Sequence, residues 1–520
     1  MTRARITLAA LVALALTPAD AAACGGFFCS AAAPVNQAGE DIVYAVEDDG
    51  SLTMTIRIVY QGTAAEFAWI LPVPVLPLDI AVGSEALFQS LAQATGPSFQ
   101  SATRTDGVCR SEPACDYPMS SFGCAAESAD AFPARGFADA AVGVSFDGGG
   151  VTVVREETVG PYETVVLSGG TAEELQTWLT DNGYDIPESS IPLMGEYVAA
   201  RQLFVALRLR NGAMVSEIQP LVLRMAETQP CLPIRLTAIA TVPDLPIAAY
   251  FLADAPAVPT NYSLLEPPAN DLRLWNGSLL WTDHVSAAVD DAGGHAFVTD
   301  YAGDVPSLSL ELPSVDDLAT VTSTSTYARE LQSRGYTADG GLASIIGRFV
   351  EPASMASCMA QGTTCGTATS FDPAGLTLAI DEQITQPRLD AQAMLARHSV
   401  LTRLFTTLSA EEMTLDPEFM IDAGVPMQSN VHTATTVTEC GPEFFVSTAP
   451  QHIELPDGSR VVLTEGEPGV SDDQFCERRG GSVAGRGGCS ASIGHVRGLP
   501  ALLAIIGITI ALTWRRRRRR

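Results

Sequence analysis

Eleven cysteines constrain this chain more than any other feature, because each disulfide formed among them would hold two separate parts of the chain together. In an oxidising compartment, so many cysteines are typical of disulfides rather than of free thiols. Eleven is odd, and Cys489 lies in a glycine-rich stretch where a bridge would gain little, so we assign it as the unpaired cysteine. The other ten are expected to form five bridges: Cys24, Cys29, Cys109, Cys115, Cys124, Cys231, Cys358, Cys365, Cys440 and Cys476.

The spacing of these cysteines leaves their pairing open. The most local choices are Cys358 with Cys365 and Cys440 with Cys476. Ligation of zinc is the alternative use of such thiols, but the sequence contains no C-x-x-C pair. We therefore expect a disulfide framework.

The N-terminus indicates how the chain reaches an oxidising compartment. Arg3 and Arg5 precede an apolar run over residues 6–16, and Ala21 and Ala23 supply the small residues of a cleavage site. This layout is typical of a secretory signal peptide over residues 1–23. The mature chain would begin at Cys24, which is either disulfide-bonded or acylated as in lipoproteins. We favour the disulfide.

The C-terminus predicts a second topological signal. Residues 498–514 contain no charge and are followed by six arginines at 515–520. At 1.5 Å per residue the uncharged stretch covers about 25 Å, the short limit for a bilayer. A core helix is the alternative, but a block of like charges rarely ends one. We expect a single transmembrane helix with a cytoplasmic arginine tail, preceded by a glycine-rich stalk at 465–497.

This C-terminal region, with its small residues, Cys489, apolar helix and arginine cluster, resembles the C-terminal sorting signals of myxobacterial and related surface proteins. The resemblance implies that export and sorting machinery reads the tail, and that the helix is removed afterwards. Whether it is removed in this chain stays open. The expected location is the cell envelope, with the body either anchored in the membrane or sorted to the outer surface.

The charge balance excludes some functions. The thirty cationic residues are all arginine, which rules out Schiff-base and P-loop lysine chemistry. Residues 24–514 carry 22 arginines against 59 acidic residues, a net charge of −37. A body this acidic repels phosphate backbones, so we expect no nucleic-acid partner.

Hydrophobic patterning predicts an α+β fold. Residues 42–60 alternate around an acidic turn, as in a β-hairpin. The segment 66–71 is followed by alternate prolines and is expected to leave the sheet in extended form. A helix is predicted at 84–93 and further strands at 203–209 and 234–240.

These elements define the expected domains. Residues 24–265 form an α+β domain of mainly antiparallel strands, with a disulfide-rich insertion at about 104–150. Residues 266–464 form a second, partly helical region, with helices predicted at 326–335, 342–349 and 388–405.

Five ordered motifs resemble an uncharacterised bacterial family of secreted proteins, known only as a domain of unknown function. The motifs are Cys24-Gly25-Gly26-Phe27-Phe28-Cys29, Trp69-Ile70-Leu71-Pro72-Val73-Pro74, Val159-Gly160-Pro161-Tyr162, Trp178 to Tyr184, and Pro233 to Thr237. The resemblance covers about residues 24–265. It implies no activity, cofactor or catalytic residue.

No common catalytic motif occurs in the sequence. It lacks H-E-x-x-H, G-x-S-x-G, P-loop and G-x-G-x-x-G patterns. The six histidines are scattered without ligand spacing, and a cysteine nucleophile would need protection from oxidation. We therefore predict no catalytic residue and no cofactor.

A weak calcium site is the one metal candidate. Asp290, Asp291, Asp300 and Asp304 lie in a glycine-containing stretch and could supply oxygen ligands. Their spacing does not match an EF-hand. Acidic residues in the solvated loops of an acidic protein are the simpler explanation.

Two classes of function remain. The first is a non-enzymatic envelope protein for adhesion, scaffolding or ligand binding, which export, disulfides and the lack of catalytic motifs favour. The second is a secreted hydrolase whose carboxylates come together only on folding. A deep polar cleft with paired acids of perturbed pKa would distinguish the two.

Overall fold

The computed structural model describes twelve ranges of the chain: 27–28, 36–61, 68–116, 150–184, 187–209, 218–226, 229–239, 241–266, 271–275, 278–363, 366–479 and 482–483. The chain forms two compact units. The first comprises Met1–Ala102, Phe132–Thr435 and Glu454–Ser459. The second comprises Thr103–Ala131, Thr436–Ile453 and Arg460–Arg520.

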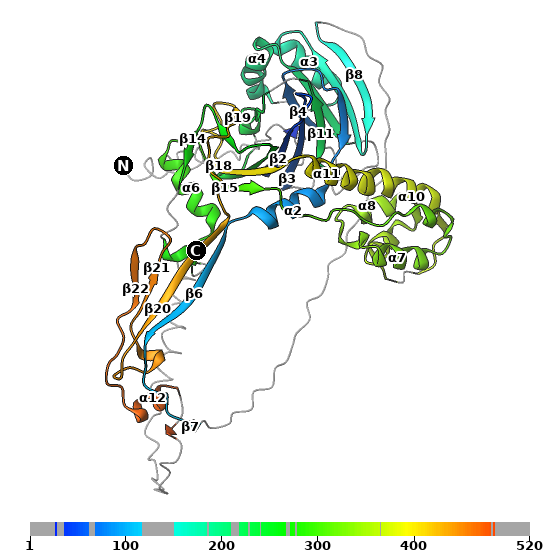
Figure 1. The fold of residues 1–520 in the computed structure, drawn as a ribbon. Coiled ribbons are helices and arrows are strands. Elements are labelled where there is room, and N and C mark those ends of the chain that lie inside the picture. Colours follow the sequence, from blue (N-terminus) through cyan, green and yellow to red (C-terminus); the bar gives the residue numbers. More distant parts are fainter. Residues whose placement is uncertain are drawn as a thin grey trace, which may run out of the picture. The chain divides into compact units, whose positions relative to one another are not determined.

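The first unit contains an eight-stranded sheet, in the order β14, β15, β18, β12, β2, β3, β11, β5 (Figure 1). The strands span, in that order, Ser263–Leu265, Ala296–Asp304, Val400–Leu408, Leu245–Ala253, Asn36–Val46, Leu52–Gln61, Leu221–Met225 and Asp79–Val82. Strand β12 is buried at every position except Pro246. It pairs parallel to β2 and antiparallel to β18, so it forms the centre of the core.

The hairpin predicted at 42–60 is confirmed. Strands β2 and β3 pair antiparallel, with Ile42 opposite Ile56 and Tyr44 opposite Met54, and these four side chains are buried. Gly50 in the connecting turn has a φ of 81°, which glycine adopts without strain.

The first unit also contains a five-stranded sheet, in the order β1, β4, β10, β9, β8. These strands span Phe27–Phe28, Ala68–Val73, Leu203–Leu209, Tyr162–Ser168 and Thr152–Val159. Helices α3 (Ala172–Asp181) and α4 (Ile191–Ala199) share a hydrophobic core with this sheet. The capping box that starts α3, Thr171 with Glu174, is formed by both of its hydrogen bonds.

The expected exit of residues 66–71 from the sheet is wrong. Strand β4 pairs with β10 along its length, and Pro72 lies opposite Phe204. On its other side, the described residues of β1 pair with β4 at Ala68 and Trp69. Among the described residues Pro72 has no strand partner on that side, so its missing N–H interrupts no described ladder there.

A helical lobe occupies residues 312–385 and has a hydrophobic core of its own. Its helices are α7 (Thr324–Ser333), α8 (Leu342–Gly347), α9 (Ala356–Ala360) and α10 (Pro373–Ile380), with short strands β16 (Val350–Glu351) and β17 (Ser370–Phe371). The helices predicted at 326–335 and 342–349 are confirmed. Helix α10 continues through a π-helical turn, η7 (Asp381–Thr385), into α11 (Gln386–Arg397).

The helix predicted at 388–405 ends earlier than expected. After α11 the chain turns at His398, and residues 400–408 form strand β18. This segment is rich in β-branched and aromatic residues and lies between β15 and β12 in the sheet. A domain boundary near residue 265 is therefore wrong, because strands from both sides of it share one sheet and one core.

The strand predicted at 234–240 is also wrong. Over its described part this segment forms a turn and the 3₁₀ helix η3 (Thr237–Ile239). The buried carboxylate of Asp416 accepts hydrogen bonds from the backbone N–H groups of Ile234 and Arg235, at 3.0 and 3.2 Å. These N–H groups are therefore satisfied by a side chain instead of a neighbouring strand.

The first unit also contains several short elements. The helices are α2 (Glu85–Thr95), which confirms the helix predicted at 84–93, α5 (Leu272–Trp275) and α6 (Trp281–Asp291). Strands β13 (Ala257–Pro259) and β19 (Phe419–Ile421) form a two-stranded sheet. The remaining 3₁₀ helices are Glu188–Ser190, Asp316–Thr320, Tyr336–Ala338 and Ala353–Met355.

The second unit contains strands of a four-stranded sheet in the order β22, β21, β20, β6. The strands span Arg460–Thr464, Gln451–Glu454, Val431–Cys440 and Ser98–Gly107, and a few terminal residues of β20, β21 and β6 are assigned to the first unit. A two-stranded sheet of β7 (Cys115–Asp116) and β23 (Ser482–Val483), the 3₁₀ helix Val446–Thr448 and helix α12 (Asp472–Arg478) complete the unit. Residues 117–149 of the predicted insertion lie outside the described residues.

Two disulfides cross-link this unit, Cys109–Cys440 and Cys115–Cys476. The local pairing of Cys440 with Cys476 is therefore wrong. Helix α12, whose Cys476 is fully buried, also shows that the stalk predicted to start at 465 is folded at its beginning. The disulfide to Cys115, 361 residues earlier in the chain, holds the segment that glycine and charge content marked as a linker.

The other cysteines differ in state. Cys231 is a free thiol, so the expectation that it forms a bridge is wrong. Cys358 is disulfide-bonded, and its partner lies outside the described residues. Cys24, Cys29, Cys124, Cys365 and Cys489 lie outside them too.

The fold is α+β with mostly sheets, but the transmembrane helix in the predicted fold class is contradicted. Among the described residues no helix combines the length and the apolar composition of a bilayer span. The long helical run from α10 to α11 carries charged residues, including Asp381, Arg388 and Arg397. The predicted signal peptide and residues 498–514 lie outside the described residues.

Candidate functional site: a polar pocket in the first unit

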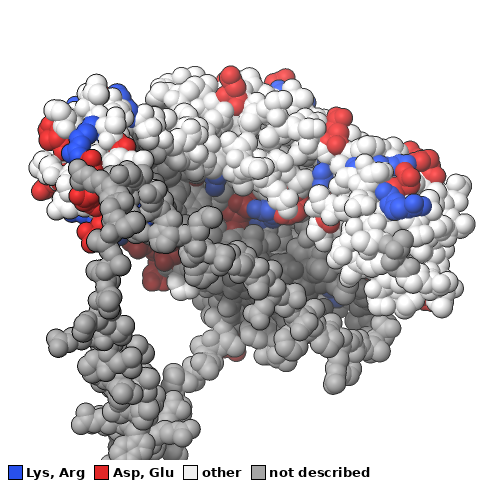
Figure 2. Space-filling model, turned by 90° about the horizontal axis from the view of Figure 1, so that it is seen from below, with Lys and Arg blue, Asp and Glu red and all other residues white. Residues whose placement is uncertain are grey.

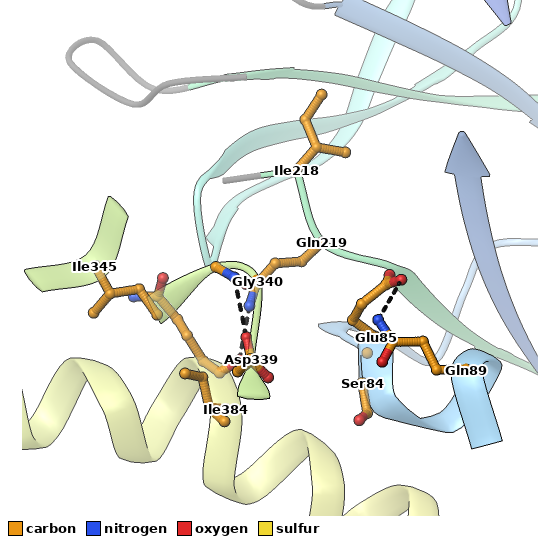
Figure 3. A pocket seen from close by; sticks show the side chains of 12 residues that line it. Ser84, Glu85, Gln89, Ile218, Gln219, Asp339, Gly340, Ile345 and Ile384 are labelled. Carbon is orange, nitrogen blue, oxygen red and sulfur yellow. Dashed lines mark hydrogen bonds between the residues drawn. The ribbon is translucent and has the colours of Figure 1, made fainter. Parts of the chain in front are cut away.

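A pocket of about 250 Å³ lies between the start of α2, the segment before β11 and the helical lobe (Figure 3). Its walls combine polar side chains, glycine backbone and a few isoleucines. The lining residues are Gly83, Ser84, Glu85, Gln89, Ile218, Gln219, Asp339, Gly340, Gly341, Ile345, Gln383 and Ile384. The volume is that of a small ligand.

Helix α2 supplies one wall. Ser84 is its N-cap, and Glu85 and Gln89 follow one turn apart, so both side chains lie on the same helix face. Arg57 on β3 donates a hydrogen bond of 2.5 Å to Glu85 Oε1. Burial raises the pKa of the Glu85 carboxyl above its usual value, although Arg57 acts in the opposite direction.

Gln219 connects this wall to the helical lobe. The Tyr162 hydroxyl accepts from the Gln219 backbone N–H and donates to the Gln219 carbonyl, both at 2.7 Å. The Gln219 side chain extends toward the lobe (Figure 3), where its Nε2 donates to the Gln383 carbonyl at 2.7 Å. The Gln219 Oε1 atom is buried without a hydrogen-bond partner.

Gly160 makes room for this arrangement. Its φ is +54°, and a Cβ at this position would lie 2.5 Å from Val82 and 3.4 Å from Gln219 Oε1. Any larger residue would therefore be strained and would push against Val82. The Val159-Gly160-Pro161-Tyr162 motif, singled out by family resemblance, thus holds Gln219 in place.

The helical lobe supplies the opposite wall. Asp339 forms an ion pair with Arg388 at 3.2 Å, and both side chains are about a tenth exposed. The Gly341 N–H donates to Asp339 Oδ1 at 3.1 Å. Both carboxylate oxygens of Asp339 are thus held by partners, so its position is fixed before any ligand arrives.

The π-helical turn η7 brings Gln383 and Ile384 to the pocket. In a π turn the hydrogen-bond pattern of the α-helix is interrupted, and such turns occur often at functional sites. Here the Gln383 carbonyl accepts from Gln219, and the Gln383 side-chain oxygen accepts from Arg348 at 3.0 Å. The turn is therefore held by residues from both sides of the pocket.

Acidic and basic side chains lie beside one another on the face in Figure 2. Ion pairs in the first unit include Arg208 with Glu163 and Arg397 with Glu47. Arg57 contacts the carboxylates of both Asp41 and Glu85, and Arg235 and Arg334 likewise each contact two carboxylates. The pocket wall at α2 therefore carries two negative charges for one positive charge.

The structure does not bring the four calcium candidates together. Asp290 and Asp291 are exposed at the end of α6, and Asp304 is exposed at the end of β15. Asp300 is fully enclosed at a β-bulge, where it pairs with Arg403 at 3.3 Å and accepts from Trp281 Nε1 at 2.9 Å. Among the described residues there is no cluster of three or more metal-binding side chains. Calcium binding stays a prediction without a site.

The free thiol does not form a nucleophilic site. Burial raises the pKa of Cys231 to about 12, with a further contribution from Asp416. A thiol with such a pKa carries almost no thiolate at neutral pH. Cys231 belongs to a structural region in which Tyr197 donates to Asp416 at 2.9 Å and Tyr44 donates to the Cys231 carbonyl at 2.8 Å.

Sequence reasoning missed the pocket. Its polar residues come from four separated parts of the chain and match no motif. The one signal was indirect: Gly160 and Tyr162 lie in a family motif and hold Gln219, although they do not line the pocket themselves.

A family model described as an uncharacterised protein conserved in bacteria, DUF2330, matches residues 18–338. The chain belongs to this family. The match extends well beyond the motifs that first indicated it and includes the start of the helical lobe. No curated protein and no solved structure matches the chain significantly. Within this DUF2330 protein the match covers the α2 wall and Gln219 but ends one residue before Asp339.

Proposed function

We propose that this protein is an exported, non-enzymatic binding protein that holds a small polar ligand in the pocket between α2, Gln219 and the helical lobe. The observation that carries the proposal is that the polar groups of the pocket are held in place by other residues. Arg57 holds Glu85, Arg388 and Gly341 hold Asp339, and Gln383 holds Gln219. Such preorganisation lowers the entropic cost of binding.

The extracytoplasmic location is part of this proposal. The two disulfides of the second unit support it, because disulfides persist in oxidising compartments. The signal-peptide pattern of residues 1–23 points the same way. We propose that the folded body works in the cell envelope or at its surface.

A variant that fills the pocket tests the binding function. A Cβ on Gly340 would meet no atom within 4 Å, so Gly340→Phe is expected to fold and to occupy the cavity. In a thermal-shift screen of small polar solutes, a ligand at about 100 times its Kd should stabilise the wild type by about 2.7 kcal/mol. The same ligand should not stabilise Gly340→Phe.

The control is Leu378→Ala, which changes an exposed side chain of α10 in the same lobe. It should keep the ligand response of the wild type. A screen in which every stabilising solute acts equally on Gly340→Phe would show that the pocket is not the binding site.

A hydrolase is the second candidate, and one observation favours it. Glu85 and Asp339 line the same pocket, and the pKa of Glu85 is raised, as in acid–base pairs of carboxylates. The contact of Glu85 with Arg57 argues against a proton-donor role. Nuclear magnetic resonance can follow whether a pocket ligand is converted to product when it is incubated with the protein. Turnover by the wild type that Glu85→Gln abolishes would favour the hydrolase over the binding protein.

A further inference from the structure

We infer that the pocket binds a small organic cation, whose ammonium group pairs with the carboxylate of Glu85. The inference rests on the proposed function and adds the ligand class to it. Three features of the α2 wall support it: its charge, the exposure of Glu85, and the hydrogen bonds that Glu85 already makes.

The first feature is the charge of the wall. Arg57 Nε donates to Asp41 at 2.9 Å, and Arg57 Nη1 donates to Glu85 at 2.5 Å. One guanidinium therefore serves two carboxylates and leaves one net negative charge. Asp339 across the pocket adds none, because Arg388 compensates it. The wall can accept one positive charge without leaving a charge unpaired.

The second feature is accessibility. The Glu85 side chain is 39% exposed, whereas those of Asp41 and Asp339 are 18% and 12% exposed. Arg57 is 18% exposed, and its guanidinium lies over the Phe88 ring at 5.1 Å. Its side chain is therefore less accessible to a ligand than that of Glu85. Of these three carboxylates, Glu85 is thus the one that a ligand reaches most easily.

The third feature is the state of the Glu85 oxygens. Arg57 and Gln89 both donate to Oε1, at 2.5 and 3.5 Å, which leaves Oε2 for a ligand. Burial raises the pKa of this carboxyl, and Asp41 adds to the effect. A bound cation would lower the pKa of Glu85 again, because an opposite charge favours the ionised carboxylate.

Other ligand classes fit less well. An anion would be repelled by the uncompensated negative charge at Glu85 and by the field of a body with 22 arginines and 59 acidic residues. A neutral ligand could donate to Glu85, but a charged donor makes the stronger hydrogen bond to a carboxylate. The pocket of about 250 Å³ equals roughly eight water molecules at about 30 Å³ each, which limits the ligand to one ring or a short chain.

A charge-matched set of probes tests the ligand class. Glucosamine, glucose and glucuronate share one ring, and ethanolamine, ethylene glycol and glycolate share one short chain, with charges of plus one, zero and minus one in each set. Calorimetric titration of the full chain should show at least one amine binding about tenfold more tightly than its neutral counterpart. The matching anion should bind most weakly.

Two variants test whether Glu85 is the residue that causes the preference for the amine. Glu85→Gln keeps the size of the side chain and an acceptor for Arg57, and should reduce the preference for the amine to about onefold. Glu382→Gln removes the same charge from an exposed position of η7 that does not line the pocket, and should keep the preference. Thermal unfolding of each variant checks that it is folded.

The outcomes separate this inference from the proposed function. Amines that bind no better than their neutral counterparts, or a preference that survives in Glu85→Gln, would overturn the inference. The inference is also overturned if no amine binds but the solute screen finds another ligand that Gly340→Phe excludes. In that case the proposed binding function stands. When no solute is sensitive to Gly340→Phe, both fall.

Discussion

The two units of this protein are stabilised by different means. The described residues of the first unit bury three hydrophobic clusters, the largest of which extends across the eight-stranded sheet. The cluster found in the second unit has four buried members, Phe445, Val470, Phe475 and Cys476. Both disulfides with described partners lie in this second unit.

The strands show the same contrast. Strand β12 of the first unit is buried at nearly every position, whereas β22 of the second unit is exposed at four of its five positions. A strand exposed at most of its positions gains little from apolar burial. Covalent cross-links between distant segments supply stability where the core is small.

Removal of both disulfides should have the largest effect. The bridges join residues 331 and 361 apart in sequence, and a single cross-link over such a long loop contributes about 6 kcal/mol in the chain-entropy model. The variant Cys109→Ser/Cys115→Ser should lose the fold of the second unit and keep that of the first. Hydrogen exchange of β20 and α12 against β12 measures this.

Cys231→Ser is the matched control, because it removes the free thiol of the first unit. It should leave exchange in the second unit unchanged. If β20 and α12 stay protected without the bridges, the contrast between the units is smaller than their cores indicate.

A pH-dependent effect of smaller size should be confined to the first unit. Glu40 is 4% exposed, and burial raises its pKa from 4.5 to about 7, while Gln37 donates to it at 2.7 Å. Between these pH values the folded state binds more protons than the unfolded state, so stability falls as the pH rises from about 4.5 to 7.

Glu40→Gln removes the ionisable group, so the variant should not lose stability through position 40 as the pH rises. Urea unfolding at pH 8 should show the variant more stable than the wild type by on the order of 3 kcal/mol, and nearly equal to it at pH 4. Glu311→Gln, at an exposed position, should show no such difference. A gain that is the same at both pH values would mean that packing, not ionisation, is responsible.

The smallest effect compares two matched helix caps. Thr171 caps α3 in the first unit and Ser471 caps α12 in the second, each within a capping box. Replacement of either residue by alanine should cost about 1 kcal/mol. Hydrogen exchange should show faster opening of α3 alone in Thr171→Ala and of α12 alone in Ser471→Ala. Equal changes in both helices would show that the units open together.

Local signals in the sequence were reliable where neighbouring residues decide the structure. The hairpin around Gly50 and helices α2, α7 and α8 follow from alternation and helical spacing. Long-range partners decided the errors. Residues 400–405 became a strand between β15 and β12, and Asp416 took the N–H groups of Ile234 and Arg235.

The candidate site depends almost entirely on such partners. Glu85, Gln219 and Asp339 are separated by more than a hundred residues at each step, and none lies in a recognisable motif. Only the motif at Gly160 and Tyr162 indicated that this part of the chain has a special geometry. The residues that hold a site are therefore easier to find from sequence than the residues that form it.

The sequence by itself determined the family, the α+β class, the acidic charge and the presence of disulfides, because composition, periodicity and motifs are local properties. The tertiary structure decided which cysteines pair, which segments join the central sheet, and how Arg57 comes to serve two carboxylates. These features depend on burial and on contacts between distant residues. The free energy of such contacts exists only in the folded chain, so no local pattern encodes it.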